Sequence, residues 1–363
     1  MKIGIIARTW FTSIKGGSER YIARLLEELR ESHQVKAITL DRSEDKDVIQ
    51  LKLPRISLIT QFLFSVLASR KMNKIHPNVC IINQYWGELS PLFLKVPWIP
   101  VIHDIGLFYS EWARKHRLKH FIRTRVLSQV TKKAKLIIVP SQLTAQDLHK
   151  YLNVPIKKIC LIPEGIDLSE FKSLPVRHKG VNIVCVARIA PNKGQAVLIK
   201  AFKYIKEKYP ASKLYFVGGV SKYQKNYRKK LDILVQKLKM DDVIFTGYVS
   251  EKELIKYYNL ADIYVQPSVG EEGWGITIVE AYGCKKPVIC TEIFYKTGVA
   301  AGDRAHIVKC NSVGELAKAI ELLIEDKELC RKLAEAGYAF AQRLSWKRTA
   351  DTVLKAVNHL VDA

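Results

Sequence analysis

Two glutamates eight positions apart mark the most chemically informative segment of this 363-residue chain. Residues 268–290 read SVGEEGWGITIVEAYGCKKPVIC, with Glu272 before a Gly-Trp-Gly turn and Glu280 inside a predicted helix. The free N–H groups and the dipole of a helix N-terminus attract anions, and carboxylates beside it can accept hydrogen bonds from hydroxyls. Phosphate next to hydroxyls describes a nucleotide sugar. The alternative is an acidic loop before an ordinary amphipathic helix, which is the better interpretation of a glutamate pair taken alone.

A second predicted helix start, in CVARIAPNKGQAVLIKAF, carries two cations. Arg188 and Lys193 lie five residues apart in a Pro-containing turn, and Gly194 stands where the helix begins. Two cations at a helix N-terminus can bind both phosphates of a diphosphate. Two exposed basic residues are the alternative, since the chain has 59 Lys and Arg.

The first half of the chain offers two further candidates. His103 and Asp104 end the apolar run PWIPVIHD, at the carboxyl end of a predicted strand, where sites form in α/β sheets. Gly16 and Gly17 allow a close backbone approach to a ligand before a helix that Ser18 could cap. A structural histidine and a plain tight turn are the respective alternatives.

These motifs, in this order, resemble the retaining glycosyltransferases of the GT-B fold, most closely glycosyltransferase family four (glycosyl transferases group one). Glu272-Gly-Trp-Gly followed by Glu280 is similar to the Glu-x7-Glu signature of that family, and Arg188 with Lys193-Gly194 to its diphosphate clamp. The resemblance covers almost the whole chain. It implies an α/β protein of two Rossmann-like domains facing across a cleft, with a C-terminal helix that packs back on the first domain.

The resemblance also implies roles for single residues. Glu272 would hold the hydroxyls of the donor sugar, Glu280 the ribose hydroxyls, and Arg188 with Lys193 the diphosphate. His103 would contact the donor sugar or the acceptor, while Asp104 would orient its ring or contact the acceptor. The strand-end Ser141 and the turn Glu164–Gly165 would line the cleft without a chemical role. The implied catalytic set is Arg188, Lys193, Glu272 and His103, and the implied donor-binding set is Gly16, Gly17, Gly247, Tyr248, Val249, Gly273, Trp274, Gly275, Ile276 and Glu280.

The implied reaction moves a hexosyl unit from a nucleoside-diphosphate sugar to an acceptor hydroxyl with retention of configuration. No cofactor or metal ion is expected, and a UDP- or GDP-linked donor is preferred. The acceptor would be a glycan, a glycolipid or a lipid-linked oligosaccharide. The segment TEIFYKTGVAAGDRAHIV departs from the Gly-rich turn and Pro-Glu pair usual at this point of the family, which leaves the identity of the sugar open.

Three other functions compete with this one. A non-hydrolysing sugar-nucleotide epimerase of the same fold should lack the ordered Glu272 and Glu280. A catalytically silent GT-B scaffold or membrane-binding partner of a glycan assembly complex need not keep Arg188 and Lys193. A dehydrogenase is disfavoured because no GxGxxG follows the first strand of either half.

The elements needed to position these residues alternate along the chain. Apolar strand-like runs and amphipathic helices alternate from KIGIIA onward, and the pattern restarts at VNIVCVA, which predicts two parallel sheets wound with helices. Helices are expected in the first half at 18–32, 54–75, 111–133 and 144–152. We expect a first domain at 1–168, a linker at 169–180, a nucleotide-sugar domain at 181–344 and a returning helix at 345–363.

The charge of the chain points to an anionic surface. The formal net charge is +24, and between residues 105 and 146 Glu111 is the only acid against nine Lys and Arg. Aromatic residues lie among these cations in FYSEWARKHRLKHFIRTR, which suits docking to an anionic membrane surface. A solvated basic helix is the alternative, and nothing resembles a nucleic-acid-binding module. The seven scattered cysteines and the missing leader sequence predict a cytoplasmic protein, with peripheral attachment to the cytoplasmic membrane face as an option.

Overall fold

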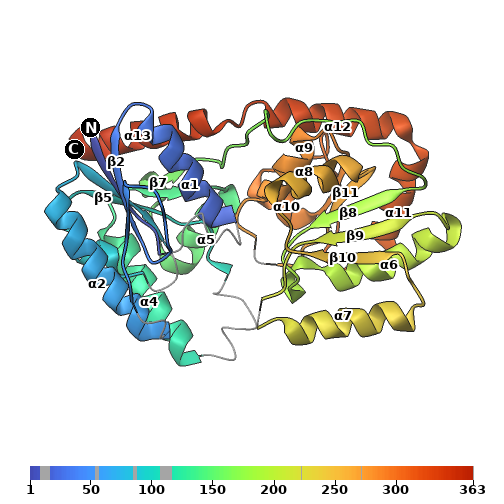
Figure 1. Cartoon of the computed structure of the whole chain (residues 1–363), viewed down its shortest axis with the longest axis horizontal. Coiled ribbons are helices and arrows are strands. Elements are labelled where there is room, and N and C mark those ends of the chain that lie inside the picture. The colour runs from blue at the N-terminus through green and yellow to red at the C-terminus, as the bar shows by residue number, and fades with distance from the viewer. Residues whose placement is uncertain are drawn as a thin grey trace. The chain divides into compact units, whose positions relative to one another are not determined.

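The computed structural model describes residues 1–8, 17–53, 57–84, 88–106, 117–221, 223–270 and 272–362. The chain forms two compact units, one of Met1–Gly165 with Trp346–Ala363 and one of Ile166–Ser345. Each unit has its own parallel sheet with helices on both faces, as the alternating pattern predicts (Figure 1).

The sheet of the first unit has seven parallel strands in the order β3-β2-β1-β4-β5-β6-β7. The central strands are apolar throughout because helices cover them on both faces. The strands are β1 (Lys2–Ile6), β2 (Gln34–Thr39), β3 (Val48–Gln50), β4 (Val79–Asn83), β5 (Trp98–Val101), β6 (Ile137–Val139) and β7 (Ile159–Leu161).

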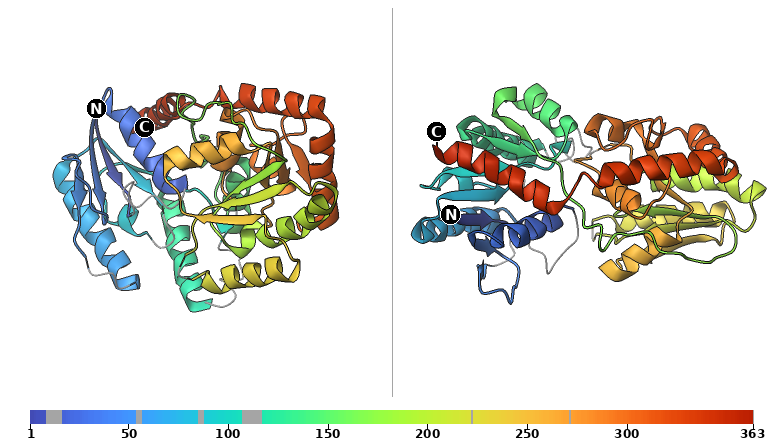
Figure 2. Two further views of the ribbon diagram at one scale, coloured as in Figure 1. Left: turned by 45° about the vertical axis from the view of Figure 1, so that its right-hand side comes forward. Right: turned by 90° about the horizontal axis from the view of Figure 1, so that it is seen from above.

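Helices from both ends of the chain cover one face of this sheet. The last helix, α13, returns to the first unit and buries Trp346, Val353 and Val357 against α1, in agreement with the predicted returning helix (Figure 2). The opposite face is covered by α2, α4 and α5. The helices are α1 (Gly17–Arg30), α2 (Ser57–Ile75), α4 (Arg117–Lys133), α5 (Gln142–Leu152) and α13 (Trp346–Asp362), with 3-10 turns η2 (Ser90–Leu92) and η4 (Ile156–Lys158).

The second unit has a six-stranded sheet in the order β10-β9-β8-β11-β12-β13, again parallel. Two apolar clusters lie on its two faces. The strands are β8 (Asn182–Val186), β9 (Lys213–Val217), β10 (Val243–Gly247), β11 (Ile263–Gln266), β12 (Val288–Thr291) and β13 (His306–Val308). The helices are α6 (Gln195–Lys208), α7 (Lys225–Lys237), α8 (Glu251–Leu260), α9 (Ile276–Gly283), α10 (Glu292–Thr297), α11 (Val313–Glu325) and α12 (Lys327–Ala341), with the 3-10 turn η5 (Pro191–Lys193).

Three details differ from the sequence expectations. Ile166 pairs with Ser345 and belongs to the second unit, three residues before the expected linker. The departing segment after β12, expected as a loop, begins with the short helix α10, which buries Phe294 and ends at Gly298 with φ +88°. Helix α5 starts at Gln142, two residues early, because the Ser141 hydroxyl accepts a hydrogen bond from the Thr144 N–H and caps it.

Candidate functional site

Two loops at the carboxyl edge of the second sheet meet through their backbones. The loop after β8 contains Asn192, and the loop after β11 contains Val269, whose N–H donates to the Asn192 carbonyl over 2.8 Å. Gly194 makes this approach possible. Its φ is +70°, and a Cβ there would lie 1.9 Å from the Pro267 carbonyl oxygen, so no larger residue fits without a shift of backbone.

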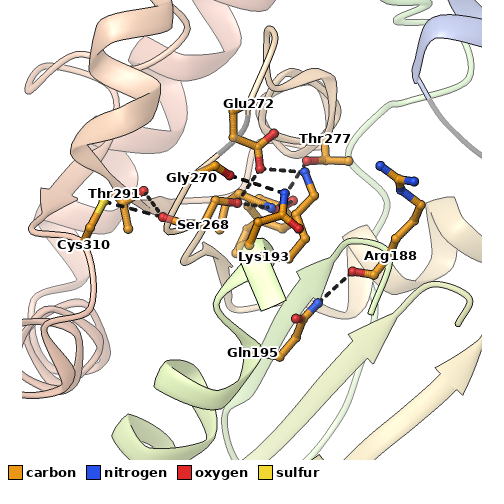
Figure 3. A network of polar contacts seen from close by, with 12 residues as sticks. Arg188, Lys193, Gln195, Ser268, Gly270, Glu272, Thr277, Thr291 and Cys310 are labelled. Carbon is orange, nitrogen blue, oxygen red and sulfur yellow. Dashed lines mark hydrogen bonds and ion pairs between the residues drawn. The ribbon is translucent and has the colours of Figure 1, made fainter. Parts of the chain in front are cut away.

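Lys193 and Glu272 come together on these loops (Figure 3). The Lys193 Nζ lies 2.6 Å from Glu272 Oε1, and the two side chains are only 14% and 9% exposed. The same carboxylate oxygen accepts a 2.5 Å hydrogen bond from the Ser268 hydroxyl. A largely buried ion pair of this kind interacts more strongly than a surface pair, and the ammonium can exchange the carboxylate for an anionic ligand.

A polar network holds Ser268 in place, and sequence analysis missed it. The Gln266 Nε2 donates to the Ser268 hydroxyl over 3.2 Å, and the Thr291 hydroxyl donates to the Ser268 carbonyl over 2.7 Å. The Cys310 thiol also points to this carbonyl, at 3.7 Å (Figure 3). The sequence carries a signal for these residues, because the apolar run IYV of β11 is followed directly by polar Gln266 and by Ser268 at the edge where ligands bind.

Arg188 lies on the loop between β8 and η5. Its carbonyl accepts a 2.9 Å hydrogen bond from Gln195 Nε2 at the start of α6, which fixes the backbone of this loop. The side chain is exposed, and Figure 3 shows the guanidinium outside the Lys193–Glu272 pair. Within the described part of the chain, the Arg188 guanidinium makes no hydrogen bond or ion pair. Arg188 can therefore meet an anion without giving up a protein partner.

Glu280 is buried in the second turn of α9. It is 2% exposed, and the Tyr258 hydroxyl of α8 donates to its Oε2 over 2.5 Å. The Tyr258 ring packs in the core while its hydroxyl holds the carboxylate. Gly275, at φ +107°, starts the helix at a point where a Cβ would lie 2.9 Å from the Phe294 ring.

The remaining residues of the glycine turn divide between core and surface. Trp274 packs in the apolar cluster that contains Tyr258, and its ring is 6% exposed. Gly273 and Ile276, on either side of the Trp274–Gly275 pair, are half-buried. The Trp274 side chain thus anchors the turn in the core, and the residues on either side of it remain partly exposed.

The predicted donor-binding residues Gly247, Tyr248 and Val249 form a turn at the end of β10. Gly247 has φ +74° with open space around it, and Tyr248 is 67% exposed while Val249 is half-buried. The Gly218 N–H donates to the Gly247 carbonyl over 3.0 Å, and the Ile189 N–H donates to the Gly219 carbonyl over 3.0 Å. These bonds connect the turn to the loop that carries Arg188.

In the first unit, His103 is held on both ring nitrogens. Its Nε2 lies 2.8 Å from Asn83 Oδ1, and its Nδ1 lies 3.3 Å from an oxygen of the buried Glu164. The Tyr21 ring contacts the imidazole edge-on at 5.1 Å. Sequence analysis gave Glu164 no chemical role and expected Asp104 either to orient the ring or to contact the acceptor. Asp104 Oδ1 accepts the Gly106 N–H over 3.2 Å in a local turn, and Asn83 and Glu164 are the groups that contact the ring. Contact of Asp104 with the acceptor stays a prediction.

The neighbourhood of His103 is tightly enclosed. Burial and the nearby Glu164 carboxylate raise the pKa of Tyr21 well above its usual range. The Asn83 Nδ2 donates to the Ser18 carbonyl over 3.4 Å, which connects His103 to the start of α1. Ser18 itself is the second residue of α1 and not its cap, because the helix begins at Gly17. Gly16 lies outside the described residues.

A separate cavity of about 390 Å³ opens at the other end of the second sheet. Residues at the starts of strands and the α11–α12 junction line it, among them Val181, Ile263, Leu323 and Cys330. It contains none of the predicted site residues. The carboxyl edge, where the charged groups converge, remains the candidate site.

The chain matches two protein-family models that together extend over most of its length. The family described as Glycosyltransferase Family 4 matches residues 15–170, and the family described as Glycosyl transferases group 1 matches residues 168–340. The match of the second family includes every candidate residue of the second unit.

Curated relatives resemble the chain at low identity over most of its length. D-inositol 3-phosphate glycosyltransferase of Corynebacterium jeikeium is 25% identical over 80% of this chain and 73% of its own. Alpha-monoglucosyldiacylglycerol synthase of Acholeplasma laidlawii is 27% identical over 80% of each chain.

Solved structures share the fold of the whole chain. Sucrose-phosphate synthase of Thermosynechococcus elongatus superposes with a TM-score of 0.84 at 22% identity, covering 99% of this chain and 98% of its own. Anabaena HepE, solved in complex with UDP-glucose, superposes with a TM-score of 0.83 at 18% identity, covering 99% and 100%. At these identities the likeness establishes the fold.

Proposed function

Since the chain belongs to the GT-B glycosyltransferases, with a Glycosyltransferase Family 4 region followed by a group 1 region, we propose that it moves a hexosyl unit from a nucleoside-diphosphate sugar to an acceptor hydroxyl with retention of configuration. The observation that carries the proposal is the Lys193–Glu272 ion pair on the loops that begin α6 and follow β11. A cation for phosphate and a carboxylate for hydroxyls are the two groups that such a donor needs.

We propose that donor binding opens this pair. The diphosphate takes the Lys193 ammonium together with the exposed Arg188 guanidinium, and Glu272 is released to accept hydrogen bonds from the sugar hydroxyls. The N–H groups at the start of α6 add to the positive potential. Cleavage of the glycosidic bond places negative charge on the departing diphosphate, and Arg188 and Lys193 stabilise it where it develops. These groups would supply the positive charge without a metal ion.

Glu280 would bind the ribose of the donor. Its carboxylate is buried and one oxygen is fixed by the Tyr258 hydroxyl, so the group is oriented before the ligand arrives. A preoriented carboxylate loses little conformational freedom on binding a diol. The backbone at Gly247, Tyr248 and Val249 would contact the base. We favour UDP or GDP, and the fold neighbour HepE was solved with UDP-glucose.

For the acceptor we propose a glycan, a glycolipid or a lipid-linked oligosaccharide at the cytoplasmic face of a membrane. The relative named alpha-monoglucosyldiacylglycerol synthase supports the glycolipid among these classes. The excess of Lys and Arg in the chain suits an anionic lipid surface. None of the described helices is both long and apolar enough to cross a bilayer.

Isothermal titration against UDP, GDP and ADP, and then against their glucose, galactose and mannose conjugates, tests the donor site. We expect one nucleotide to bind selectively and Lys193→Ala to abolish that binding. Lys200→Ala, which removes an exposed lysine from α6, the helix that follows Lys193, is the matched control and should bind as the wild type does. No binding by the wild type to any of these ligands would favour a catalytically silent GT-B scaffold.

A further inference from the structure

The outward face of α2 is apolar in its first turns, although the helix already packs other apolar residues against the sheet. Ile59, Phe62 and Leu67 are 58%, 51% and 37% exposed, and Leu63 and Val66 between them are half-buried. These positions follow a spacing of three and four residues and so form one stripe along the helix. A helix on the surface of a soluble protein normally turns this stripe to the core.

The inward face of the same helix is already occupied, because Phe64, Ala68 and Met72 pack in the core and polar residues lie beside them. Thr60, Gln61, Ser65 and Ser69 are almost fully buried. The Ser65 hydroxyl donates to the buried Glu88 carboxylate over 2.8 Å, and the Ser69 hydroxyl donates to the Ser90 carbonyl over 2.9 Å, among other bonds. The inward positions are therefore committed to core packing and hydrogen bonds, and the outward apolar side chains cannot be explained by a rotated helix.

Helix α4 also exposes large apolar side chains at its start. Leu118, Phe121 and Ile122 are 71%, 55% and 41% exposed. The intervening polar residues Arg123 and Thr124 are half-buried instead. Burial and the nearby Arg8 guanidinium lower the pKa of Arg123, so positive charges crowd together beneath this stripe.

The two helices lie on one face of the first sheet and begin at the same edge. Helix α2 packs over β1, β2 and β4 and α4 over β6, while Trp98 of β5 contacts both clusters (Figure 1). Each helix follows the carboxyl end of a parallel strand. The exposed stripes therefore lie toward the edge of the sheet that also carries His103. We call the stripes of Ile59, Phe62, Leu67, Leu118, Phe121 and Ile122 the apolar face.

The positive charge around the apolar face indicates an anionic partner. The sequences of α2 and α4 contain nine Lys and Arg and no Asp or Glu. On α2 the outward stripe continues from Leu67 to the exposed Arg70 and Lys74, and on α4 the Arg125 guanidinium lies 5.1 Å from the centre of the Phe121 ring. Large apolar side chains next to cations, with no acid among them, match the boundary between lipid headgroups and acyl chains in an anionic bilayer.

We propose that the apolar face docks this protein on an anionic membrane, with Phe62 and Phe121 inserted among the lipids and Arg70, Lys74 and Arg125 on the headgroup phosphates. The acceptor edge of the first unit then faces the surface on which a lipid-linked acceptor is displayed. This consequence for the acceptor rests on the proposed function, whereas docking itself does not.

Flotation of the full chain with lipid vesicles tests the proposal without any donor or acceptor. Vesicles of phosphatidylcholine alone are compared with vesicles that also contain phosphatidylglycerol. We expect binding to the anionic vesicles only, falling as salt is added. Arg70→Gln with Lys74→Gln should lower the partition coefficient about fivefold for each charge removed. Phe62→Ser with Phe121→Ser should lower it roughly tenfold for each ring.

Tyr204→Ser with Ile233→Ser is the matched control, because these second-unit side chains are 61% and 63% exposed. It should leave vesicle binding unchanged. Wild-type protein that stays unbound on both vesicle types would overturn the proposal, as would equal loss in the control. A wild-type dimer that Phe62→Ser converts to a monomer, without vesicle binding, would assign the face to a second copy of the chain instead. Nucleotide titration of the same variants should match the wild type, so a failure of docking and a failure of the donor site remain distinct.

Discussion

Each unit of this glycosyltransferase places a glutamate beside a basic side chain at the carboxyl edge of its sheet, and the two pairs are built for different tasks. In the second unit Glu272 shares its Oε1 between Lys193 and Ser268, and both residues of the ion pair lie on loops. In the first unit Glu164 contacts a His103 ring that is also bonded to Asn83 and packed against Tyr21. The Lys193–Glu272 pair can exchange partners, whereas Glu164 can only hold the His103 ring.

The difference follows from what surrounds each pair. The charges of Lys193 and Glu272 balance each other, and a donor offers phosphate as a new anion for the ammonium and hydroxyl groups as hydrogen-bond donors for the carboxylate. His103 has protein acceptors at both nitrogens, and a neutral imidazole has one N–H to give. A ligand that reaches this ring must replace Asn83 or contact another part of the residue. We infer that the second unit binds the donor by exchanging the partners of Lys193 and Glu272, and that the first unit holds the His103 ring in position.

Loss of the cation should give the largest effect. Lys193→Ala should lower kcat by about 10²- to 10³-fold, equivalent to about 2.7–4 kcal/mol, because the charge that develops on the leaving diphosphate loses its nearest counterion. The unfolding midpoint should shift much less, since the lysine stands on a loop. Steady-state kinetics and thermal unfolding of Lys193→Ala and Lys200→Ala measure both. Equal losses of rate and stability would mean that the Lys193–Glu272 pair has a structural role, as the contact between Glu164 and His103 has in the first unit.

The backbone that carries the exchangeable pair should be the next most sensitive feature. Gly194→Ala should lower the free energy of unfolding by about 2–4 kcal/mol, because it combines a positive φ with a Cβ placed on the Pro267 carbonyl. Gly314→Ala is the matched control, since its Cβ would meet open space at an ordinary φ near the start of α11. Urea unfolding of both variants gives the comparison. Similar stabilities would mean that the two loops can separate without cost.

The sequence predicted the Lys193–Glu272 pair in part and missed the contact between His103 and Glu164. Helix starts and Gly-containing turns are local signals, so Lys193, Glu272 and Glu280 could be selected from their spacing and from a family resemblance. Glu164 and His103 are 61 residues apart, and Ser268 depends on Thr291, which follows in a later strand. Only the order of the strands in the sheet brings such residues together, and spacing along the chain does not contain that order.

The fold was easier to predict than the contacts within it. Alternating apolar runs and amphipathic helices determine two wound parallel sheets, and the returning α13 was also expected. The exceptions are informative. Tyr258 lies on the amphipathic helix α8 and its ring packs in the core, but nothing in the sequence indicates that its hydroxyl reaches Glu280. The exposure of the apolar stripe on α2 could not be predicted either, because periodicity identifies a stripe without saying which side faces the sheet.

Substitutions of Glu164, which contacts His103 in the first unit, should lower the rate by an amount that depends on whether the new side chain can still hydrogen-bond to the ring. Glu164→Ala should lower kcat about tenfold, since the imidazole loses one of its two hydrogen-bond partners and its orientation. Glu164→Gln keeps an oxygen at the same place and should recover most of the rate. Kinetics of both variants, with circular dichroism to verify folding, test this. Glutamine as damaging as alanine would show that the negative charge is required, and the first-unit pair would then be electrostatic as the second is.

The smallest effect should come from the group that orients the predicted ribose site. Tyr258→Phe removes the hydroxyl that donates to Glu280 Oε2 and leaves the ring in the core. We expect nucleoside-diphosphate binding to weaken about five- to tenfold, because a hydrogen bond to a buried carboxylate contributes about 1.5 kcal/mol or less once the carboxylate can turn to another donor. Isothermal titration of Tyr258→Phe beside Tyr257→Phe, whose neighbouring ring is only half-buried, measures the difference. Unchanged affinity would mean that Glu280 is held by the rest of α9, and preorientation would then be a property of the first unit alone.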